Sequence, residues 1–322
     1  MNEALTSAAS VSVPTPSPAS APTPALAPAS APAPAQSGLL SLVATPIGNL
    51  GDLSPRARDT LSAADCIVCE DTRVTRKLLN HFGIIQRLVR GDENVLAQKT
   101  QTFVEEMCQG AHIAFVSDAG MPGVSDPGQV LCDACLDAGI RVEVIPGASA
   151  SVAALAASGF ASEHFFFEGF LPRRASEKRA RLQLLSHIPA TLIIYESPHR
   201  VEDTLSPIAE VFADARVALI RELTKIHETC LRGTAASLMA TISARADAPL
   251  KGECVIVIEC APARAKEIED QLLAQASSPL VPLETAIAEG LAVGTSKSQL
   301  ARELARSYKL SKSEIYNKLV GF

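Results

Sequence analysis

The chain lacks the features that mark several common protein classes. No apolar run among its 322 residues approaches the roughly 20 residues that a membrane-spanning helix needs, so no membrane association is expected. A formal net charge of −6 argues against a protein that coats nucleic acid nonspecifically, although it is compatible with a local basic patch. The length indicates about two domains, each large enough to bury its own core.

Sequence motifs of common nucleotide and hydrolase sites are also missing. The chain contains no G-x-G-x-x-G fingerprint with a distal acid and no G-x-x-x-x-G-K-[ST] loop, which disfavours a dinucleotide or a P-loop nucleotide. It contains no H-E-x-x-H string and no Ser-His-Asp elbow. A polar, adenosine-sized or amino-acid-like ligand remains open.

Eight cysteines include two C-x-x-C pairs, Cys66/Cys69 and Cys132/Cys135. The first pair lies in an apolar strand pattern, where residues three apart point to opposite faces and cannot easily share a metal ion. The second pair lies in a helical pattern, without the spacing or the histidines of a zinc site. Buried, reduced thiols in a reducing cytoplasm are therefore expected, and no metal site.

Residues 1–37 differ from the rest in composition. They are almost entirely Ala, Pro, Ser and Thr, and Glu3 is their single charged side chain. Closely spaced prolines block helices and strand ladders, so a disordered or polyproline-like tail is expected. The tail has neither the basic start nor the apolar stretch of a signal peptide.

Residues 38–160 are predicted to form an α/β domain with a mostly parallel sheet covered on both faces, because apolar strand patterns alternate with helical patterns. Ser54 is the expected N-cap of the first helix, with Pro55 at its first position. The strands are expected at 39–44, 66–69, 113–116 and 141–145.

Residues 161–262 are predicted to form a second α/β domain with more antiparallel pairing, since several strand patterns follow one another closely. A linker is expected at 263–281, and a helix-turn-helix-like region at 282–322, where Ser311 and Glu314 form a capping box. Residues 296–318 hold six Lys or Arg against two Glu. Contact with nucleic acid and a plain solvated helical unit are both open for this region.

Unusual loops follow four predicted strands of the first domain. They are Ala44–Asp52, Cys69–Arg73, Ser117–Gly128 and Ile145–Ser149. In an open parallel sheet, ligands bind outside the carboxyl ends of the strands, where these loops fall. The third loop has three glycines that allow close approach to the main chain and two prolines that stiffen it. It predicts a rigid pocket lined by backbone.

Seven strings carry a family resemblance: VATPIGNLGD, EDTR, SDAGMPGVSDPG, IPGAS, FFFEGFLPR, YESPHR and IREL-K-HE. They closely resemble the branch of the tetrapyrrole methylase family that modifies small-subunit ribosomal RNA. The resemblance covers residues 38–322 and excludes the proline-rich tail. It implies two α/β domains with S-adenosylmethionine (SAM) bound in the cleft between them. It also implies methylation of a cytidine ribose 2′-hydroxyl in the decoding region of 16S rRNA, within the small subunit, by a homodimer.

Carried over by position, the resemblance assigns the donor site to Pro46, Asp118, Ala119, Gly120, Val124, Ser125 and Ser149. One departure concerns a string such as H-x-H-N, which relatives often carry. This chain has Gly91-Asp92-Glu93-Asn94 at that place, so no catalytic role for a histidine there is assumed.

Methyl transfer to a ribose hydroxyl is assisted by a general base or a polarising cation. The candidates are Glu70, Asp71, Arg73, Glu196 and His199. Helix capping with an ion pair is the alternative for Glu70–Arg73, because acids favour a helix N-terminus. No single base is chosen.

A basic strip is the expected contact for RNA phosphates. It consists of Arg173, Arg174, Lys178, Arg179 and Arg181, opposed by Glu177 alone. A solvated helix face is its alternative. Two other functions are open: methylation of a corrin precursor, which needs no basic strip, and a noncatalytic nucleic-acid-binding protein, which leaves the four loops without a role.

Overall fold

The computed structural model describes residues 38–244, 250–277, 282–308 and 310–320. The expected tail, 1–37, lies outside these residues. Within the described part, no helix is both long and apolar enough to cross a membrane.

The first sheet is built from parallel strands, as predicted. Its strands are β1 (Leu39–Val43), β2 (Cys66–Cys69), β3 (Leu88–Arg90), β4 (His112–Val116) and β5 (Arg141–Ile145), in the order β3-β2-β4-β1-β5. The helices that connect them are α1 (Pro55–Ala63), α2 (Thr72–His81), α3 (Glu93–Cys108) and α4 (Gly128–Asp137), with a 3-10 turn η1 (Leu50–Asp52).

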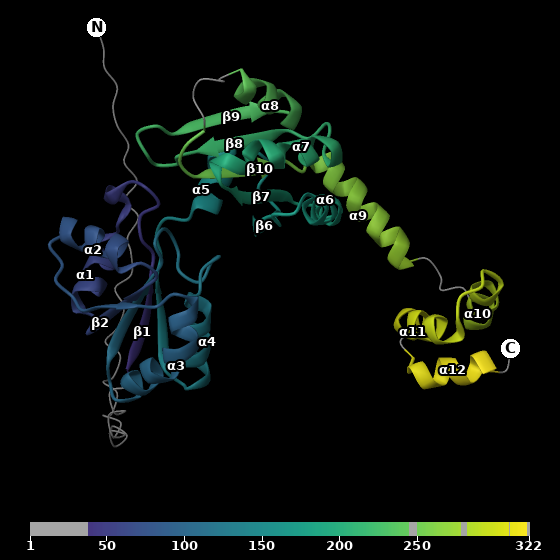
Figure 1. Ribbon diagram of the computed structural model, residues 1–322, viewed down its shortest axis with the longest axis horizontal. Helices are drawn as coiled ribbons and strands as arrows, with labels where there is room; N and C mark the ends of the chain where they lie inside the picture. The colour runs from purple at the N-terminus through teal and green to yellow at the C-terminus, as the bar shows by residue number, and fades with distance from the viewer. Residues whose placement is uncertain (1–37, 245–249, 278–281, 309, 321–322) are drawn as a thin grey trace, which may run out of the picture. The chain divides into compact units, whose positions relative to one another are not determined.

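Helices cover both faces of this sheet (Figure 1). Leu40, Val68 and Phe115 pack against α3 and α4, whereas Val43, Ile67 and Val116 pack against α1 and α2. The two sets alternate along each strand because successive side chains of a strand point to opposite faces. Cys66 and Cys69 accordingly lie in different clusters.

Local signals placed the start of α1 correctly. The Ser54 hydroxyl accepts a hydrogen bond from the Ala57 amide at 3.1 Å, and Pro55 begins α1. An element pair that was not predicted, β3 and α3, fills the region between Gly83 and Ile113. Asp92 caps α3 by accepting from the Val95 amide at 2.9 Å.

The second sheet is mixed, with the antiparallel character expected of it. The order of its strands is β6-β7-β10-β8-β9. Among the described strand pairs of this second sheet, β6–β7 is parallel and the others are antiparallel. The strands are β6 (Phe165–Phe170), β7 (Thr191–Glu196), β8 (Val217–Arg221), β9 (Thr229–Gly233) and β10 (Cys254–Ile258). The helices are α5 (Ala150–Ser158), α6 (Ala175–Leu185), α7 (Val201–Val211) and α8 (Ala235–Ser243), with a 3-10 turn η2 (Pro198–Arg200).

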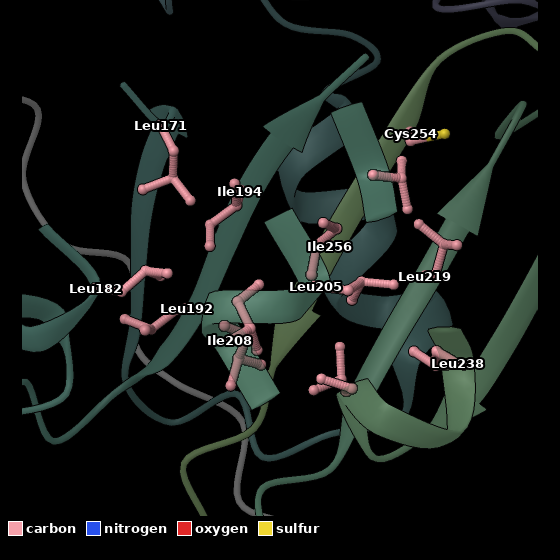
Figure 2. Close-up of a cluster of buried hydrophobic side chains, with 14 of the residues drawn as sticks. Leu171, Leu182, Leu192, Ile194, Leu205, Ile208, Leu219, Leu238, Cys254 and Ile256 are labelled. Atoms are coloured by element: carbon pink, nitrogen blue, oxygen red, sulfur yellow. The ribbon is translucent and has the colours of Figure 1, made fainter. Parts of the chain in front are cut away.

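The two faces of the second sheet are covered unequally. Figure 2 shows the larger cluster, in which Ile194, Leu219 and Ile256 of the strands meet Leu182, Leu205 and Leu238 of α6, α7 and α8. The opposite face packs Ile193, Ala218 and Val257 against α5 through Leu155. One helix covers that face, so part of it stays open near β6.

The segment expected as a linker, 263–281, contains a helix. α9 spans Pro262–Ser277, so the connection between the second sheet and the C-terminal helices is largely helical. After it come α10 (Leu283–Ala292), α11 (Lys297–Ser307) and α12 (Lys312–Val320), packed around Ile287, Leu304 and Ile315. The predicted capping box is present: the Ser311 amide donates to Glu314 Oε2 at 2.8 Å, and the Glu314 amide donates to the Ser311 hydroxyl at 3.2 Å.

Candidate active site

The four loops singled out in the sequence lie at one edge of the first sheet. The loops follow β1, β2, β4 and β5. In a parallel sheet the carboxyl ends of all strands lie at the same edge of the sheet. Two of the loops are joined by backbone. The Thr45 amide donates to the Gly120 carbonyl at 2.9 Å, and the Gly120 amide donates to the Thr45 carbonyl at 3.1 Å. This pairing fixes the third loop against the first.

The Ser117–Gly128 loop has the backbone that its glycines predicted. Gly120 and Gly123 both have φ of +85°, and Ser125 has φ of 65°. Only glycine adopts such angles without strain, so Ser125 is held there by its surroundings. Asp126 supplies part of that hold, because its Oδ1 accepts from the amides of Gly123 at 2.7 Å and Gly128 at 2.9 Å.

These loops and the second sheet enclose a cavity of about 400 Å³, a volume typical of small-molecule sites. Six of the seven predicted donor-site residues line it: Asp118, Ala119, Gly120, Val124, Ser125 and Ser149. The seventh, Pro46, is buried and does not line the cavity, and its neighbour Ile47 takes that place. The assignment of Pro46 to the donor site stays a prediction.

The cavity wall carries acidic side chains and, among the described residues, no lysine or arginine. The acids are Glu70, Asp118, Asp126, Glu196 and Glu253. Glu70 has no hydrogen bond or ion pair in the described part of the chain. Burial raises the pKa of Glu70 to about 7, and the nearby charges of Asp126 and Asp118 add to the rise. A pocket of this charge favours a ligand that brings a positive group.

Asp71 and Arg73, two of the catalytic candidates, adopt the capping arrangement that was their alternative. Asp71 is the N-cap of α2, and its Oδ1 accepts from the Arg73 amide at 2.8 Å. The Arg73 guanidinium also pairs with Asp71 at 2.6 Å, which holds the pKa of Asp71 well below its usual range. Neither residue lines the cavity. Asp71 contributes instead through its amide, which donates to Asp118 Oδ1 at 3.1 Å.

Glu196, another candidate, is buried and fully engaged. Its Oε2 accepts from the Thr204 hydroxyl at 2.7 Å, and its Oε1 accepts from the Ser197 amide at 2.9 Å and lies 3.3 Å from Arg200 Nε. These contacts fix the Ser197–Pro198 segment that lines the cavity. His199 is exposed and does not line the cavity, so of the acids considered Glu70 is the one with a free carboxylate there.

Lys178, predicted to contact RNA, lies in the interior. Its side chain is 3 % exposed, and its Nζ donates to the Thr204 hydroxyl at 2.8 Å and the Asp203 carbonyl at 3.4 Å. Burial lowers the pKa of Lys178. The charge-run pattern did not reveal this, because Lys178 occupies the core-facing position of α6 beside Leu182 and Leu185. An RNA phosphate cannot reach it.

Replacement of Lys178 by methionine is expected to destabilise the protein rather than to weaken RNA binding. The change removes one partner of a buried polar network, which costs on the order of 3 kcal/mol. Urea denaturation followed by circular dichroism measures the loss, and Lys99→Met, at an exposed position of α3, is the control. Unchanged stability with weaker RNA binding would contradict this placement.

The other four residues of the basic strip stay at the surface. Arg173 is exposed and has no ionic partner among the described residues. Arg174 pairs with Glu177, Arg179 with Glu210, and Arg181 with Glu168. The Arg181–Glu168 pair is bidentate, with two contacts of 2.7 Å, so Arg181 is committed to β6.

A further part of the cavity wall was not among the predicted site residues. It comes from the second sheet and the segments beside it: Phe170, Tyr195, Ile220, Leu223 and Gly252–Val255. Phe170, Tyr195, Ile220 and Leu223 stand in three of the strings that carry the family resemblance, but no role was assigned to them there. Residues 252–255 lie in none of the seven strings. Gly252 has φ of +88° and lies two residues before β10.

Gly91–Asn94, the string at which the sequence departs from the family resemblance, lies beside the site without lining it. The Gly91 amide donates to the Cys69 carbonyl at 2.8 Å, which places it next to the β2 loop. Asp92 caps α3 and pairs with Arg90 at 2.6 Å, and Glu93 and Asn94 are exposed. No side chain of this string lines the cavity.

Comparison with known proteins agrees with this architecture. The family model described as "Tetrapyrrole (Corrin/Porphyrin) Methylases" matches residues 39–239. "Ribosomal RNA small subunit methyltransferase I" of Streptococcus pyogenes serotype M1 is 39 % identical over 280 residues, which cover 87 % of this chain and 94 % of that protein. The chain belongs to the tetrapyrrole methylase family. Its similarity to that relative extends through most of the chain and far beyond the residues that the family model covers.

Relatives from other bacteria carry the same name. The protein from Xylella fastidiosa is 48 % identical over 226 residues, covering 69 % of this chain and 81 % of that protein. The one from Synechocystis is 41 % identical over 281 residues, covering 87 % and 96 %. Sequence identity over this much of the chain places this tetrapyrrole methylase in the group of small-subunit ribosomal RNA methyltransferases I.

Solved structures of similar fold are more distant in sequence. A diphthine synthase matches with a TM-score of 0.54 at 16 % identity, covering 69 % of this chain and 90 % of that one. A cobalt precorrin-4 methyltransferase matches with a TM-score of 0.52 at 17 % identity, covering 71 % and 97 %. At such identities the likeness concerns the fold alone, and it confirms the predicted tetrapyrrole methylase architecture.

Proposed function

We propose that this protein transfers the methyl group of SAM to the ribose 2′-hydroxyl of a cytidine in the decoding region of 16S rRNA. The observation that carries the proposal is its extended identity to relatives named for methylation of small-subunit ribosomal RNA. The site supports the same conclusion, because it joins a rigid donor loop to an acidic cavity, and Arg173, which follows the cavity residue Phe170 closely in the chain, is exposed and has no ionic partner among the described residues.

The cavity fits the donor in shape and in charge. When bound, SAM supplies an electrophilic methyl carbon on a positively charged sulfur. Gly120 leaves the backbone open where a Cβ would approach Ile47 Cγ2 to 3.3 Å and the Ala148 carbonyl to 3.4 Å. Asp118, Ala119, Gly120, Val124, Ser125 and Ser149 would hold the donor together with Ile47. The unpaired carboxylate of Glu70 matches the positive charge.

Glu70 is also the group that we assign to proton removal. A ribose hydroxyl is a poor nucleophile while it is protonated, and a base with a pKa near the working pH is effective. Glu70 lines the cavity, has no competing partner in the described part of the chain, and has a pKa raised to about 7 by burial. Glu196 is unsuited to this role because its two oxygens are engaged by Thr204, Ser197 and Arg200.

Phosphate contact is assigned to Arg173, Arg174 and Arg179, the exposed residues of the strip that do not fix β6. The α10–α12 unit is a second candidate contact. It carries exposed Arg302, Lys312 and Lys318, and Glu314 is used in the capping box. Binding through such charges is steeply salt-dependent.

The substrate class is tested by supplying labelled SAM with three acceptors. These are small ribosomal subunits that lack the modification, naked 16S rRNA, and a corrin precursor. We expect label in the RNA of the first or second sample and none in the third. Label in the corrin precursor, or in no acceptor, would contradict the proposal, and the first two samples together distinguish free rRNA from the assembled subunit.

Assembly and location are further parts of the proposal. We infer a homodimer that works in the cytoplasm on the small subunit. The eight cysteines, all present as free thiols, suit a reducing compartment. Sedimentation velocity of the purified protein checks the dimer, and a monomer at micromolar concentration would contradict it.

A further inference from the structure

Strand β6 contains an irregularity beside the donor loop. In its pairing with β7, Phe167 lies opposite Ile193 and Gly169 lies opposite Ile194, so Glu168 is an extra residue. An extra residue in a strand turns every later side chain to the other face. Without the extra residue, the Phe170 side chain would point to the face of the sheet that packs against α6 and α7, in the cluster of Figure 2. With it, Phe170 pairs with Tyr195 and lies on the open face of the sheet.

Several contacts hold this irregularity in place. Glu168 is fixed by the bidentate pair with Arg181. Gly169 has φ of +73°, and a Cβ there would lie 3.3 Å from the Ser125 hydroxyl of the donor loop. Leu171, which follows Phe170, is buried in the cluster of Figure 2. The segment from Glu168 to Leu171 thus exposes one side chain, Phe170.

Phe170 is a large aromatic residue left uncovered at the wall of the cavity. It is 59 % exposed although it lines the pocket. One side of its ring contacts Tyr195, with ring centroids 5.8 Å apart and an interplanar angle of 67°. Tyr195 is itself braced by Phe167 at 4.8 Å and by a hydrogen bond with Ser151. The ring of Phe170 is therefore supported from below and open to solvent.

The segment that follows Phe170 in the sequence carries an exposed arginine. Arg200 Nη2 donates to the carbonyls of Leu171 at 3.0 Å and Pro172 at 3.3 Å, which fixes the turn after β6. Arg173 follows that turn, exposed and without an ionic partner in the described part of the chain. An aromatic platform followed by a cationic side chain is the arrangement that binds single-stranded nucleic acid, through a base and a phosphate.

We propose that Phe170 is the platform on which the base of the methylated nucleotide stacks, while Arg173 holds an adjacent phosphate. The inference rests on the proposed function and adds to it the residue that selects an unstacked base. Stacking on Phe170 places the attached ribose at the mouth of the acidic cavity, which Phe170 shares with Glu70 and the donor loop. A paired base is shielded by its neighbours, so the site accepts a nucleotide turned out of its stack.

The test compares Phe170→Leu with Phe170→Tyr. Leucine keeps an apolar side chain but loses the ring, and tyrosine restores the ring. We expect Phe170→Leu to lower kcat/KM for the RNA substrate by about tenfold to a hundredfold, the usual effect of losing one stacked base. Affinity for SAM, measured by calorimetry, is expected to change less than twofold. Phe170→Tyr is expected to retain most of the activity.

Phe165→Leu is the matched control. Phe165 lies on the same face of β6 and is 47 % exposed, but it does not line the cavity. We expect it to leave kcat/KM unchanged. An equal loss in both leucine variants would overturn the inference, as would an unchanged rate in Phe170→Leu. So would a change of oligomeric state in Phe170→Leu with normal RNA kinetics, because the ring would then contact a second copy of the chain.

A second substrate isolates the stacked base. In 16S rRNA with an abasic ribose at the methylated position, wild-type protein is expected to lose about as much kcat/KM as Phe170→Leu loses on normal RNA. Phe170→Leu is expected to lose little more on the abasic RNA. Two independent losses that multiply would contradict stacking. If wild-type protein methylates no RNA at all, the proposed function fails, and that outcome is distinct from failure of the Phe170 assignment.

Discussion

Replacement of Gly120 by valine is expected to abolish SAM binding, with an affinity loss of about 100-fold or more while the fold persists. Gly120 has φ of +85°, which costs a β-branched residue on the order of 1–3 kcal/mol. The new side chain would also enter the space between Ile47 and Ala148, where even a Cβ lies 3.3 Å from Ile47 Cγ2. Relief of this crowding moves the loop whose amides and carbonyls form the cavity wall.

Gly139→Val separates the strain of a positive φ from the crowding of the donor loop. Gly139 follows α4 with φ of +70°, and a Cβ there meets nothing within 4 Å. It therefore carries a similar backbone penalty in open space, away from the cavity. Calorimetry with SAM and thermal unfolding are measured for both variants. Equal stability loss with normal SAM affinity in Gly120→Val would show that the donor binds elsewhere.

Replacement of Glu70 by glutamine is expected to lower kcat by about 100- to 10,000-fold, the usual contribution of a positioned base. The amide keeps the shape of the side chain and removes its ability to accept the hydroxyl proton. Glu93→Gln is the matched control, since Glu93 is an exposed carboxylate that does not line the cavity. Single-turnover methylation of RNA with saturating SAM measures the chemical step, and equal rates in wild type and Glu70→Gln would exclude Glu70 as the base.

The same assignment predicts a pH dependence. The pKa of Glu70 is raised to about 7, first by burial and then by Asp126 and Asp118. A base acts in its unprotonated form, so activity is expected to rise from pH 6 to pH 8 and then to level off. A bound positive donor favours the charged form of the Glu70 carboxylate. The midpoint of the pH profile of kcat is therefore expected at lower pH than the midpoint of kcat/KM for SAM, which reports the protein without the donor. In Glu70→Gln the residual rate is expected to be flat over this range.

The first domain was the more predictable part of the molecule. Apolar strand patterns and glycine-proline loops are local signals, and they located the strand ends and the loops that border the cavity. The donor-site residues came from the family resemblance, and six of the seven line the cavity. The cap at Ser54 and the box at Ser311 and Glu314 are likewise decided by neighbours in sequence. Ile47 rather than Pro46 lines the cavity, because a loop can turn either of two adjacent residues inward.

The features that were missed depend on contacts between distant segments. Lys178 looks like any member of a charged helix face until Thr204 of α7 and Asp203 are placed beside it. Phe170 follows three phenylalanines of ordinary strand pattern, and only the pairing register of β6 with β7 reveals that it is turned outward. The segment expected as a linker holds α9, whose helix was not predicted.

Alkaline digestion of the methylated RNA is the most direct test of the central claim, that the acidic cavity serves methyl transfer to a ribose hydroxyl. A 2′-O-methyl group blocks cleavage at the adjacent phosphodiester. Wild-type protein, labelled SAM and unmodified small subunits are therefore predicted to yield label in an alkali-resistant dinucleotide that begins with cytidine. Label released in mononucleotides would place the methyl group on a base and contradict the account.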